Sequence, residues 1–306
     1  MVSIVCNDNL DAGTGVPQYY RRMILGMECH GLGVGYVNLE KWLAGGVPRN
    51  AAEDIVVVTN QDACLIPPEF AVIAVMHGSA AELAERAGPD WAVSMVPLQA
   101  RAAKRPRTYW VACSDETAHL GNGHMGVMAD RVIFGAVDTD AFYPTARQTY
   151  KTTGRPVILH SAIDCNKGIE HIGRLESMLL ADYELRRLDT PPATVPDAMR
   201  SADMFLCLSV SEGWSLVVAE ALATGLVVVS TDVGAYWRSD CPPGYRFRWQ
   251  ERGDPDVVVK AIREAWAIRH LLNGRAWALR WLNLPAFGQK WVECIADAAK
   301  KLGVAA

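Results

Sequence analysis

The chain has 306 residues, half of them hydrophobic and 21 % charged, and its formal net charge is −4. This composition predicts a globular protein, and the length allows two domains of about 150 residues each. The weak negative charge provides no overall attraction to nucleic acid or to an anionic membrane. A local exception is the basic cluster "RAAKRPR" (Arg101, Lys104, Arg105 and Arg107), which is consistent with either a solvated face or an anion-binding surface.

Eight cysteines are scattered along the chain without a Cys-x-x-Cys pair. This usage is typical of a reduced, cytoplasmic protein rather than of a disulfide framework. The start "MVSIVCNDN" lacks a basic segment followed by a long apolar one, and no apolar run reaches the roughly 18 residues of a membrane span. His119 and His124 lie close together in "HLGNGH" without a third ligand nearby, so we expect no metal site.

Short β-branched runs alternate with helix-length segments in the first half of the chain, which is typical of a parallel α/β sheet. A first strand at 2–6 is followed by a loop at 7–17 and a helix at 18–31. Further strands are expected at 54–60, 71–78, 108–114 and 131–137, with a short helix between the last two.

Residues 138–156 lack apolar periodicity, contain two prolines, and are predicted to be a linker. The alternation then restarts with strands at 157–162, 183–188, 204–209 and 226–231, and with helices at 168–180, near 195–202 and at 215–225. The segment 260–284 is helical and rich in tryptophan, and 285–303 is an amphipathic helix. Two α/β domains in tandem are therefore predicted.

The stretch "SEGWSLVVAEALATGLVVVSTDVGA", residues 211–235, contains an unexpected carboxylate. Glu220 lies within an apolar helix that begins near Ser215 and ends at Gly225. Leu216, Ala219, Leu222 and Ala223 are expected to face the core. A buried carboxylate needs donors. A salt bridge to Arg200 provides them in one interpretation, and the paired hydroxyls of a ribose provide them in another.

Glu212 precedes this helix and follows the strand at 204–209. Ligands bind at the carboxyl ends of parallel strands, and the amides of Trp214, Ser215 and Leu216 form a helix N-terminus that favours phosphate. The carboxylates of Glu212 and Glu220 can accept hydrogen bonds from hydroxyl groups, and the helix N-terminus between them can bind phosphate. This combination suits a nucleotide sugar.

The motifs resemble those of glycosyltransferase family 4, a group of retaining enzymes with the GT-B fold. "EGWSLVVAEALATGLVVV" matches that family's Glu-x7-Glu motif. Other motifs follow in the family's order along nearly the whole chain, namely "GTGVPQYYRRM", "VMHGS", "VACSDETAHL", "VIFGAVDTDAFYP" and "CNKG".

The resemblance implies two Rossmann-like domains facing a central cleft, with the C-terminal helix crossing back to the N-terminal domain. Residues 1–145 together with 286–306 would form the acceptor-side domain, and 150–285 would bind the donor.

The resemblance also implies roles for particular residues. Glu220 would hold the donor ribose, Glu212 the transferred sugar and Lys167 the diphosphate, while His77 would contact the sugar near the reacting centre. Asp138 matches the motif's aspartate in the interdomain loop, and Tyr19 is a candidate acceptor contact. The remaining donor-binding positions provide backbone amides: Gly13, Thr14, Gly15, Trp214, Ser215 and Leu216.

The implied activity is metal-independent transfer of a sugar from a nucleotide diphosphate sugar, with UDP as the expected carrier, and with retention of configuration. The acceptor is unidentified: a protein, a lipid-linked sugar, a small molecule, or a modified DNA base as in phages. A non-catalytic nucleotide-sugar-binding protein of the same fold is the alternative, and an epimerase would need further acid and base carboxylates.

Several positions depart from the family pattern. Ala162 stands where the family has an arginine that binds the diphosphate, and Ser215 replaces a glycine. His160 or Arg155 could provide the missing cation. The region after Lys167 is short and is expected to lack one strand–helix unit.

Overall fold

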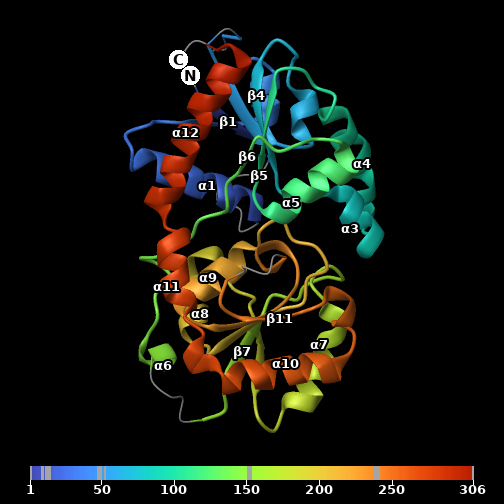
Figure 1. The fold of residues 1–306 in the computed structure, drawn as a ribbon, viewed down its shortest axis with the longest axis vertical. Coiled ribbons are helices and arrows are strands. Elements are labelled where there is room, and N and C mark those ends of the chain that lie inside the picture. The colour runs from blue at the N-terminus through green and yellow to red at the C-terminus, as the bar shows by residue number, and fades with distance from the viewer. Residues whose placement is uncertain are drawn as a thin grey trace. The chain divides into compact units, whose positions relative to one another are not determined.

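The computed structural model describes residues 2–7, 10, 15–46, 50–51, 53–149, 154–237 and 242–304, with only the backbone of Arg147 and Thr149. The chain forms two compact units, Met1–Gly135 with Leu284–Ala306 (unit 1) and Ala136–Asn283 (unit 2). Each is an α/β unit around one parallel sheet (Figure 1).

The division between the units falls earlier in the chain than the sequence places it. Residues 136–145 lie in unit 2 because their backbone is bonded to its helices. The N–H of Val137 donates to the carbonyl of Leu282 at 2.8 Å, and the guanidinium of Arg275 donates to the carbonyl of Thr139 at 3.0 Å.

The sheet of unit 1 has the strand order β2-β1-β3-β4-β5-β6, and every neighbouring pair is parallel. Its central strands β3 and β4 are buried along their whole length, as expected of a sheet covered on both faces. The strands are β1 (Val2–Cys6), β2 (Gly35–Asn38), β3 (Ile55–Thr59), β4 (Ala71–Met76), β5 (Thr108–Ala112) and β6 (Arg131–Val132). The helices are α1 (Gly15–Glu28), α2 (Leu39–Leu43), α3 (Ala80–Arg86), α4 (Asp90–Ala102), α5 (Asp115–Leu120) and α12 (Leu284–Leu302), with short turns η1 (Asp62–Leu65) and η2 (Gly121–Met125).

Helices α1 and α12 lie side by side although they are at opposite ends of the chain (Figure 1). Glycines allow the approach: a Cβ on Gly288 would lie 1.9 Å from the carbonyl oxygen of Gly26. The buried face of α12 includes Trp291, which is fully buried, and Ala298. This agrees with the amphipathic helix expected at 285–303, and the helix completes the core of unit 1.

The sheet of unit 2 has the order β11-β10-β9-β7-β8 and is also parallel throughout. The strands are β7 (Val157–His160), β8 (Glu184–Arg187), β9 (Met204–Cys207), β10 (Val227–Thr231) and β11 (Tyr245–Phe247). The helices are α6 (Ala146–Thr149), α7 (Ile169–Leu179), α8 (Val195–Arg200), α9 (Leu216–Thr224), α10 (Pro255–Ala267) and α11 (Gly274–Trp281), with turns η3 (Pro192–Thr194), η4 (Gly234–Tyr236), η5 (Trp249–Glu251) and η6 (Arg269–Leu271). Helix α7 packs with α10, and α9 packs with α8 and α11.

The strand order places a switch point in each sheet. In unit 2 the chain passes from β7 outward to β8 and then returns to β9 on the other side of β7. Loops that leave neighbouring strands in opposite directions open a crevice at the carboxyl ends, where ligands of such sheets bind. The loops after β7 and β9 contain Lys167 and Glu212, so the fold brings both to the expected ligand-binding edge of unit 2.

Two of the four cations of the basic cluster have structural partners. The Arg105 guanidinium donates to the carbonyls of Pro67 and Phe70 at 2.7 and 2.8 Å. Arg107 donates to the carbonyls of Glu69 and Leu302. Arg105 and Arg107 therefore spend hydrogen-bond donors on the fold, which weakens the interpretation of this cluster as an anion-binding surface.

Two further features concern the cysteines and the hydrophobicity of the helices. The seven cysteines within the described ranges are free thiols, and Cys241 lies outside those ranges. In the same part of the chain, the helices are too short or too polar to cross a bilayer.

Candidate functional site

Two loops meet at the switch point of unit 2, 161–168 after β7 and 208–215 after β9. Asn166 joins them: its Oδ1 accepts the N–H of Ser211 at 3.2 Å, and its carbonyl accepts the N–H of Val210 at 3.0 Å. Gly168, with a φ of +77°, allows the close approach, because a Cβ there would lie 2.8 Å from the Cβ of Leu208. The backbone thus holds Lys167 against the second loop.

Lys167 and Glu212 form an ion pair between these loops through Nζ and Oε1. The hydroxyl of Ser209 donates to the same carboxylate oxygen at 2.8 Å. Burial acts to lower the pKa of Lys167, but the neighbouring Glu212 carboxylate outweighs it and the net pKa is raised. Lys167 is therefore a charged ammonium, and the two partners of the pair neutralise each other.

The N-terminus of α9 lies next to this pair. Trp214 is buried, Ser215 precedes the first helical residue, and Leu216 begins the helix and is half-buried. Gly234 of η4 packs against this loop, since a Cβ on it would lie 2.9 Å from the Cβ of Glu212. The unsatisfied amides of the first turn attract negative charge, so an anion beside Lys167 would meet two positive groups.

Ser215 has a φ of +66°, in the left-handed region that favours glycine. Its Oγ is buried and has no hydrogen-bond partner among the described residues. Serine thus stands at the glycine position of the family motif and still adopts the left-handed backbone conformation.

Glu220 is half-buried rather than enclosed in a core helix. Ala219 and Leu222 are each 1 % exposed and face the core, as expected, while Glu220 lies at the edge of that face. The interpretation with Arg200 as its partner is not supported: that guanidinium pairs with Asp197 and donates to the carbonyl of Ala141. The position of Glu220 leaves the ribose interpretation open.

The structure excludes both suggested replacements for the missing arginine. Ala162, which stands at the position of the missing arginine, is buried, with 2 % of its surface exposed. Burial, assisted by the nearby Arg187, lowers the pKa of His160 to about 4, so its ring is neutral at pH 7. Arg155 precedes β7, at the end of the strand opposite to the site, and donates to the carbonyl of Leu180 at 2.6 Å.

Arg252 is a site residue that the sequence did not indicate. Its guanidinium donates to the carbonyls of Cys165 and Asn166 in the first loop and of Leu208 in the second, at 2.9 to 3.0 Å. It therefore fixes both loops of the switch point through their backbones. No motif marks it, because its partners are carbonyls of residues far away in the sequence.

His77 follows β4 in unit 1, and its ring contacts those of Tyr19 and Tyr20 edge-on, with centroids 4.9 and 5.4 Å away. Burial lowers the pKa of His77 to about 3. The neutral imidazole is suited to hydrogen bonding with a hydroxyl rather than to neutralising a phosphate.

The position of Tyr19 contradicts its expected role as an acceptor contact. The side chain is 2 % exposed, and its hydroxyl donates to the carbonyl of Ile133 at 2.9 Å. Its ring also contacts Phe287 and Trp291 of α12. Tyr19 is a core residue of unit 1.

Asp138 shapes the backbone at the start of unit 2. Its Oδ1 accepts the N–H groups of Asp140 and Ala141 at 3.0 and 3.1 Å. Gly15 is the exposed first residue of α1, and Gly13 and Thr14 lie outside the described residues.

Residues 173–267 match the family model of group 1 glycosyl transferases. Among solved structures, sucrose-phosphate synthase from Thermosynechococcus elongatus aligns with a TM-score of 0.73 and 14 % identity, over 97 % of this chain and 99 % of that one. HepE from Anabaena, in complex with UDP-glucose, aligns with a TM-score of 0.69 and 12 % identity, over 97 % and 100 %. A glycosyltransferase from Rickettsia africae aligns with a TM-score of 0.62 and 13 % identity, over 98 % of both chains. A comparison with curated protein sequences gives no match.

The chain is a glycosyltransferase with the GT-B fold. The family match lies within unit 2 and includes Glu212, Ser215 and Glu220 of the glycosyltransferase. His119 and His124 belong to no group of three or more potential metal ligands among the residues that the structure describes.

Proposed function

We propose that this glycosyltransferase is a retaining enzyme of family 4 that moves a sugar from a UDP-sugar to an acceptor without a metal ion. Unit 2 binds the donor, and unit 1 provides the acceptor side. The observation that carries the proposal is the Lys167–Glu212 pair at the switch point of unit 2, beside the N-terminus of α9. This places a cation, a carboxylate and helix amides at one edge of one sheet.

The donor would replace the contact between these two side chains. The diphosphate takes the ammonium of Lys167 and the amides of α9, which leaves Glu212 to accept hydrogen bonds from the transferred sugar. Ser209, which donates to the carboxylate at 2.8 Å, keeps it oriented. Positive groups held in place before the reaction stabilise the charge of the leaving diphosphate.

The configuration at the anomeric carbon is retained if the acceptor hydroxyl attacks from the same face from which the leaving group departs. The bond between the anomeric carbon and the phosphate oxygen breaks, and a bond to the acceptor oxygen forms on the same side. The departing phosphate oxygen takes the hydroxyl proton, so no further base is needed. His77 keeps its proposed role as a neutral hydrogen-bonding group for the sugar.

UDP is proposed as the carrier because HepE, which shares the fold, binds UDP-glucose. The acceptor is a protein, a lipid-linked sugar, a small molecule or a modified DNA base. The free thiols of the chain favour a reducing, cytoplasmic compartment.

A thermal-shift screen over nucleoside diphosphates and their sugars tests the donor, since a ligand that binds only the folded state raises the melting temperature. UDP release from each stabilising UDP-sugar then tests turnover. Glu220→Ala should weaken UDP binding, and Glu212→Ala should mainly slow turnover, measured as the release of UDP from the UDP-sugar. Glu184→Ala, an exposed carboxylate on β8, is the matched control. Unchanged binding and turnover in both site variants would refute these roles.

A non-catalytic nucleotide-sugar-binding protein is the second candidate. The buried Ala162 and the neutral His160 favour it, because they leave the diphosphate with Lys167 and the α9 amides. UDP binding without UDP release from any donor and acceptor tested would support this second function.

A further inference from the structure

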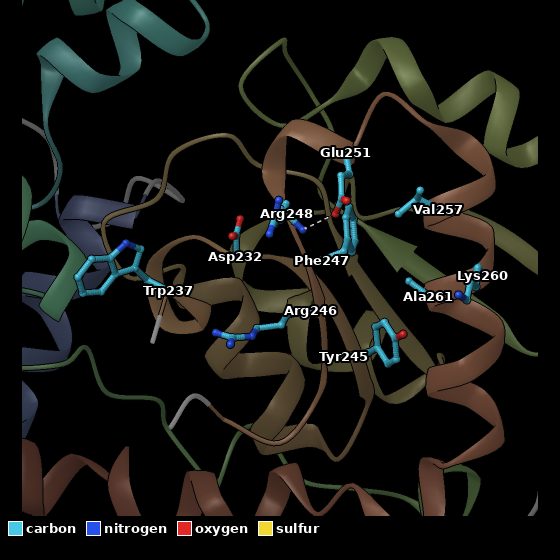
Figure 2. Close-up of a pocket in the computed structure, with 10 residues that line it drawn as sticks. All are labelled: Asp232, Trp237, Tyr245, Arg246, Phe247, Arg248, Glu251, Val257, Lys260 and Ala261. Atoms are coloured by element: carbon cyan, nitrogen blue, oxygen red, sulfur yellow. Dashed lines mark hydrogen bonds between the residues drawn. The ribbon is translucent and has the colours of Figure 1, made fainter. Parts of the chain in front are cut away.

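A pocket of about 590 Å³ lies along β11, the edge strand of the unit 2 sheet (Figure 2). Its volume is within the range of about 300–1,000 Å³ that is typical of small-molecule sites. It shares no residue with the proposed donor site. Its polar and aromatic lining includes Asp232, Trp237, Arg246, Phe247, Arg248 and Glu251.

The alternation of β11 separates its side chains into two sets. Arg246 and Arg248 are two residues apart and project toward the side of Asp232 and Trp237, whereas Tyr245 projects toward α10 (Figure 2). The guanidinium of Arg246 donates to the carbonyl of Tyr236 at 3.2 Å. That bond ties Arg246 to the residue that precedes Trp237 in the sequence.

The pocket contains both a hydrogen-bond acceptor and a donor with remaining capacity. Oδ1 of Asp232 accepts the N–H of Trp249 at 2.8 Å, and within the described ranges no partner is found for its second oxygen. In the same ranges the guanidinium of Arg248 has no hydrogen-bond partner, and its backbone N–H donates to Glu251 at 3.1 Å. A carboxylate and a guanidinium are planar groups that match the neighbouring hydroxyls of a sugar ring.

Trp237 supplies an apolar surface at one end of the same pocket (Figure 2), because it remains 38 % exposed despite its size. An indole packs against the C–H face of a sugar and leaves the hydroxyls to the polar side chains. Asp232 and Glu251 offset the charges of Arg246 and Arg248, and the remaining cation, Lys260, lies 3.9 Å from the carboxylate of Glu264. The lining therefore carries little uncompensated charge and favours a neutral ligand over an anion. A peptide strand is disfavoured since β11 offers only three residues for pairing.

From these features we propose that the β11 pocket is a subsite for a neutral saccharide, with Trp237 as the stacking surface and Asp232 and Arg248 as the hydroxyl-binding pair. The choice of a saccharide rests in part on the proposed function, because an enzyme that transfers sugars meets saccharides as acceptors and products. The subsite itself does not require the donor to be bound.

Ligand-observed NMR titrations of the full chain with maltotriose, mannotriose and galactotriose test the proposal. At least one should bind in the millimolar range or tighter, and bound UDP should not displace it. Trp237→Ala should weaken that binding by about tenfold or more, and Arg248→Gln should weaken it as well. Trp281→Ala is the matched control, since this tryptophan is 47 % exposed on α11 of the same unit but outside the pocket.

The subsite is refuted if none of the three trisaccharides binds the wild-type chain, or if both pocket variants bind as the control does. UDP binding, measured in the same samples, separates the two proposals. If the chain binds UDP but no trisaccharide, the proposed function stands and the subsite is refuted. If it binds a trisaccharide but not UDP, the subsite stands and the proposed UDP site is refuted.

Discussion

Ser215 occupies a backbone conformation that favours glycine, with φ +66° and ψ +80° before the first residue of α9. Side chains with a Cβ pay a steric penalty in this region of about 1–2 kcal/mol. The buried hydroxyl gains no partner among the described residues in return. The position is therefore strained, at the point where the amides of α9 are proposed to meet the donor.

Ser215→Gly should therefore stabilise the fold. Relief of the steric penalty, reduced by the greater freedom of glycine in the unfolded chain, leaves a net gain of about 0.5–1 kcal/mol. Urea denaturation at neutral pH measures it. Ser215→Ala also removes the unpartnered hydroxyl but keeps the Cβ and the strain, so it should be less stable than Ser215→Gly. Equal stabilities of the glycine and alanine variants would show that the backbone is not strained.

Two histidines make the stability dependent on pH. The folded pKa values of His77 and His160 are about 3 and about 4, below the ordinary value of about 6.5 in the unfolded chain. The unfolded state binds more protons below pH 6.5, so their contribution is present above that pH and is lost as the pH falls toward 4. Each histidine contributes a slope of up to about 1.4 kcal/mol per pH unit.

The free energy of unfolding, measured between pH 5 and 7.5, should fall on the acid side. The assigned ring signals of both histidines in NMR spectra should not titrate in that range. His160→Gln should flatten part of the slope. Ring signals that titrate near pH 6.5 would mean that neither imidazole is desolvated.

At the scale of elements, long buried strands and motif-bearing helices were predictable from the sequence, whereas short edge strands and the helices α3 and α4 were not predicted. The runs that became β3, β4 and β10 are apolar along their length and buried on both faces. β2 and β11 are short and only partly buried, so their residues carry no such pattern and were not predicted.

β6 is shorter than the strand expected at 131–137. Its apolar residues continue past the last sheet pair into the connection to unit 2, where Val137 donates to the carbonyl of Leu282. In the candidate site, the motif spacing predicted roles for Glu212 and Glu220, but it did not reveal that Glu212 pairs with Lys167. That contact depends on the loop-to-loop bonds of Asn166 and Arg252.

The packing of α1 on α12 predicts a stability effect at Gly288. A Cβ there would lie 1.9 Å from the carbonyl oxygen of Gly26, which belongs to backbone and cannot rotate away. Gly288→Ala should therefore force the helices apart and cost about 1–3 kcal/mol or more.

Gly173→Ala is the control for this change. Gly173 lies within α7, and a Cβ at this position would have nothing within 4 Å, so alanine should raise stability by about 0.5–1 kcal/mol. Thermal unfolding of both variants measures the contrast. A Gly288→Ala variant as stable as the wild type would contradict the tight helix contact.

At the scale of the whole molecule, Lys167, Glu212 and Glu220 belong to unit 2, whereas His77 and the donor-binding positions 13–15 belong to unit 1. Binding of UDP alone should therefore depend mainly on unit 2. His77→Ala should leave the dissociation constant for UDP within about twofold, because the proposed ligand contact of His77 is to the sugar and not to the nucleotide, and should lower kcat for transfer. A large loss of UDP affinity in this variant would refute the assignment of nucleotide binding to unit 2.

Titration calorimetry of UDP into the wild-type chain, Lys167→Ala and Glu220→Ala tests the central claim most directly. The wild type should bind, and each variant should bind at least about tenfold more weakly, equal to about 1.4 kcal/mol, while Glu184→Ala binds as the wild type does. Absence of UDP binding by the wild type, or equal affinity in all four proteins, would contradict a nucleotide site at the switch point of unit 2.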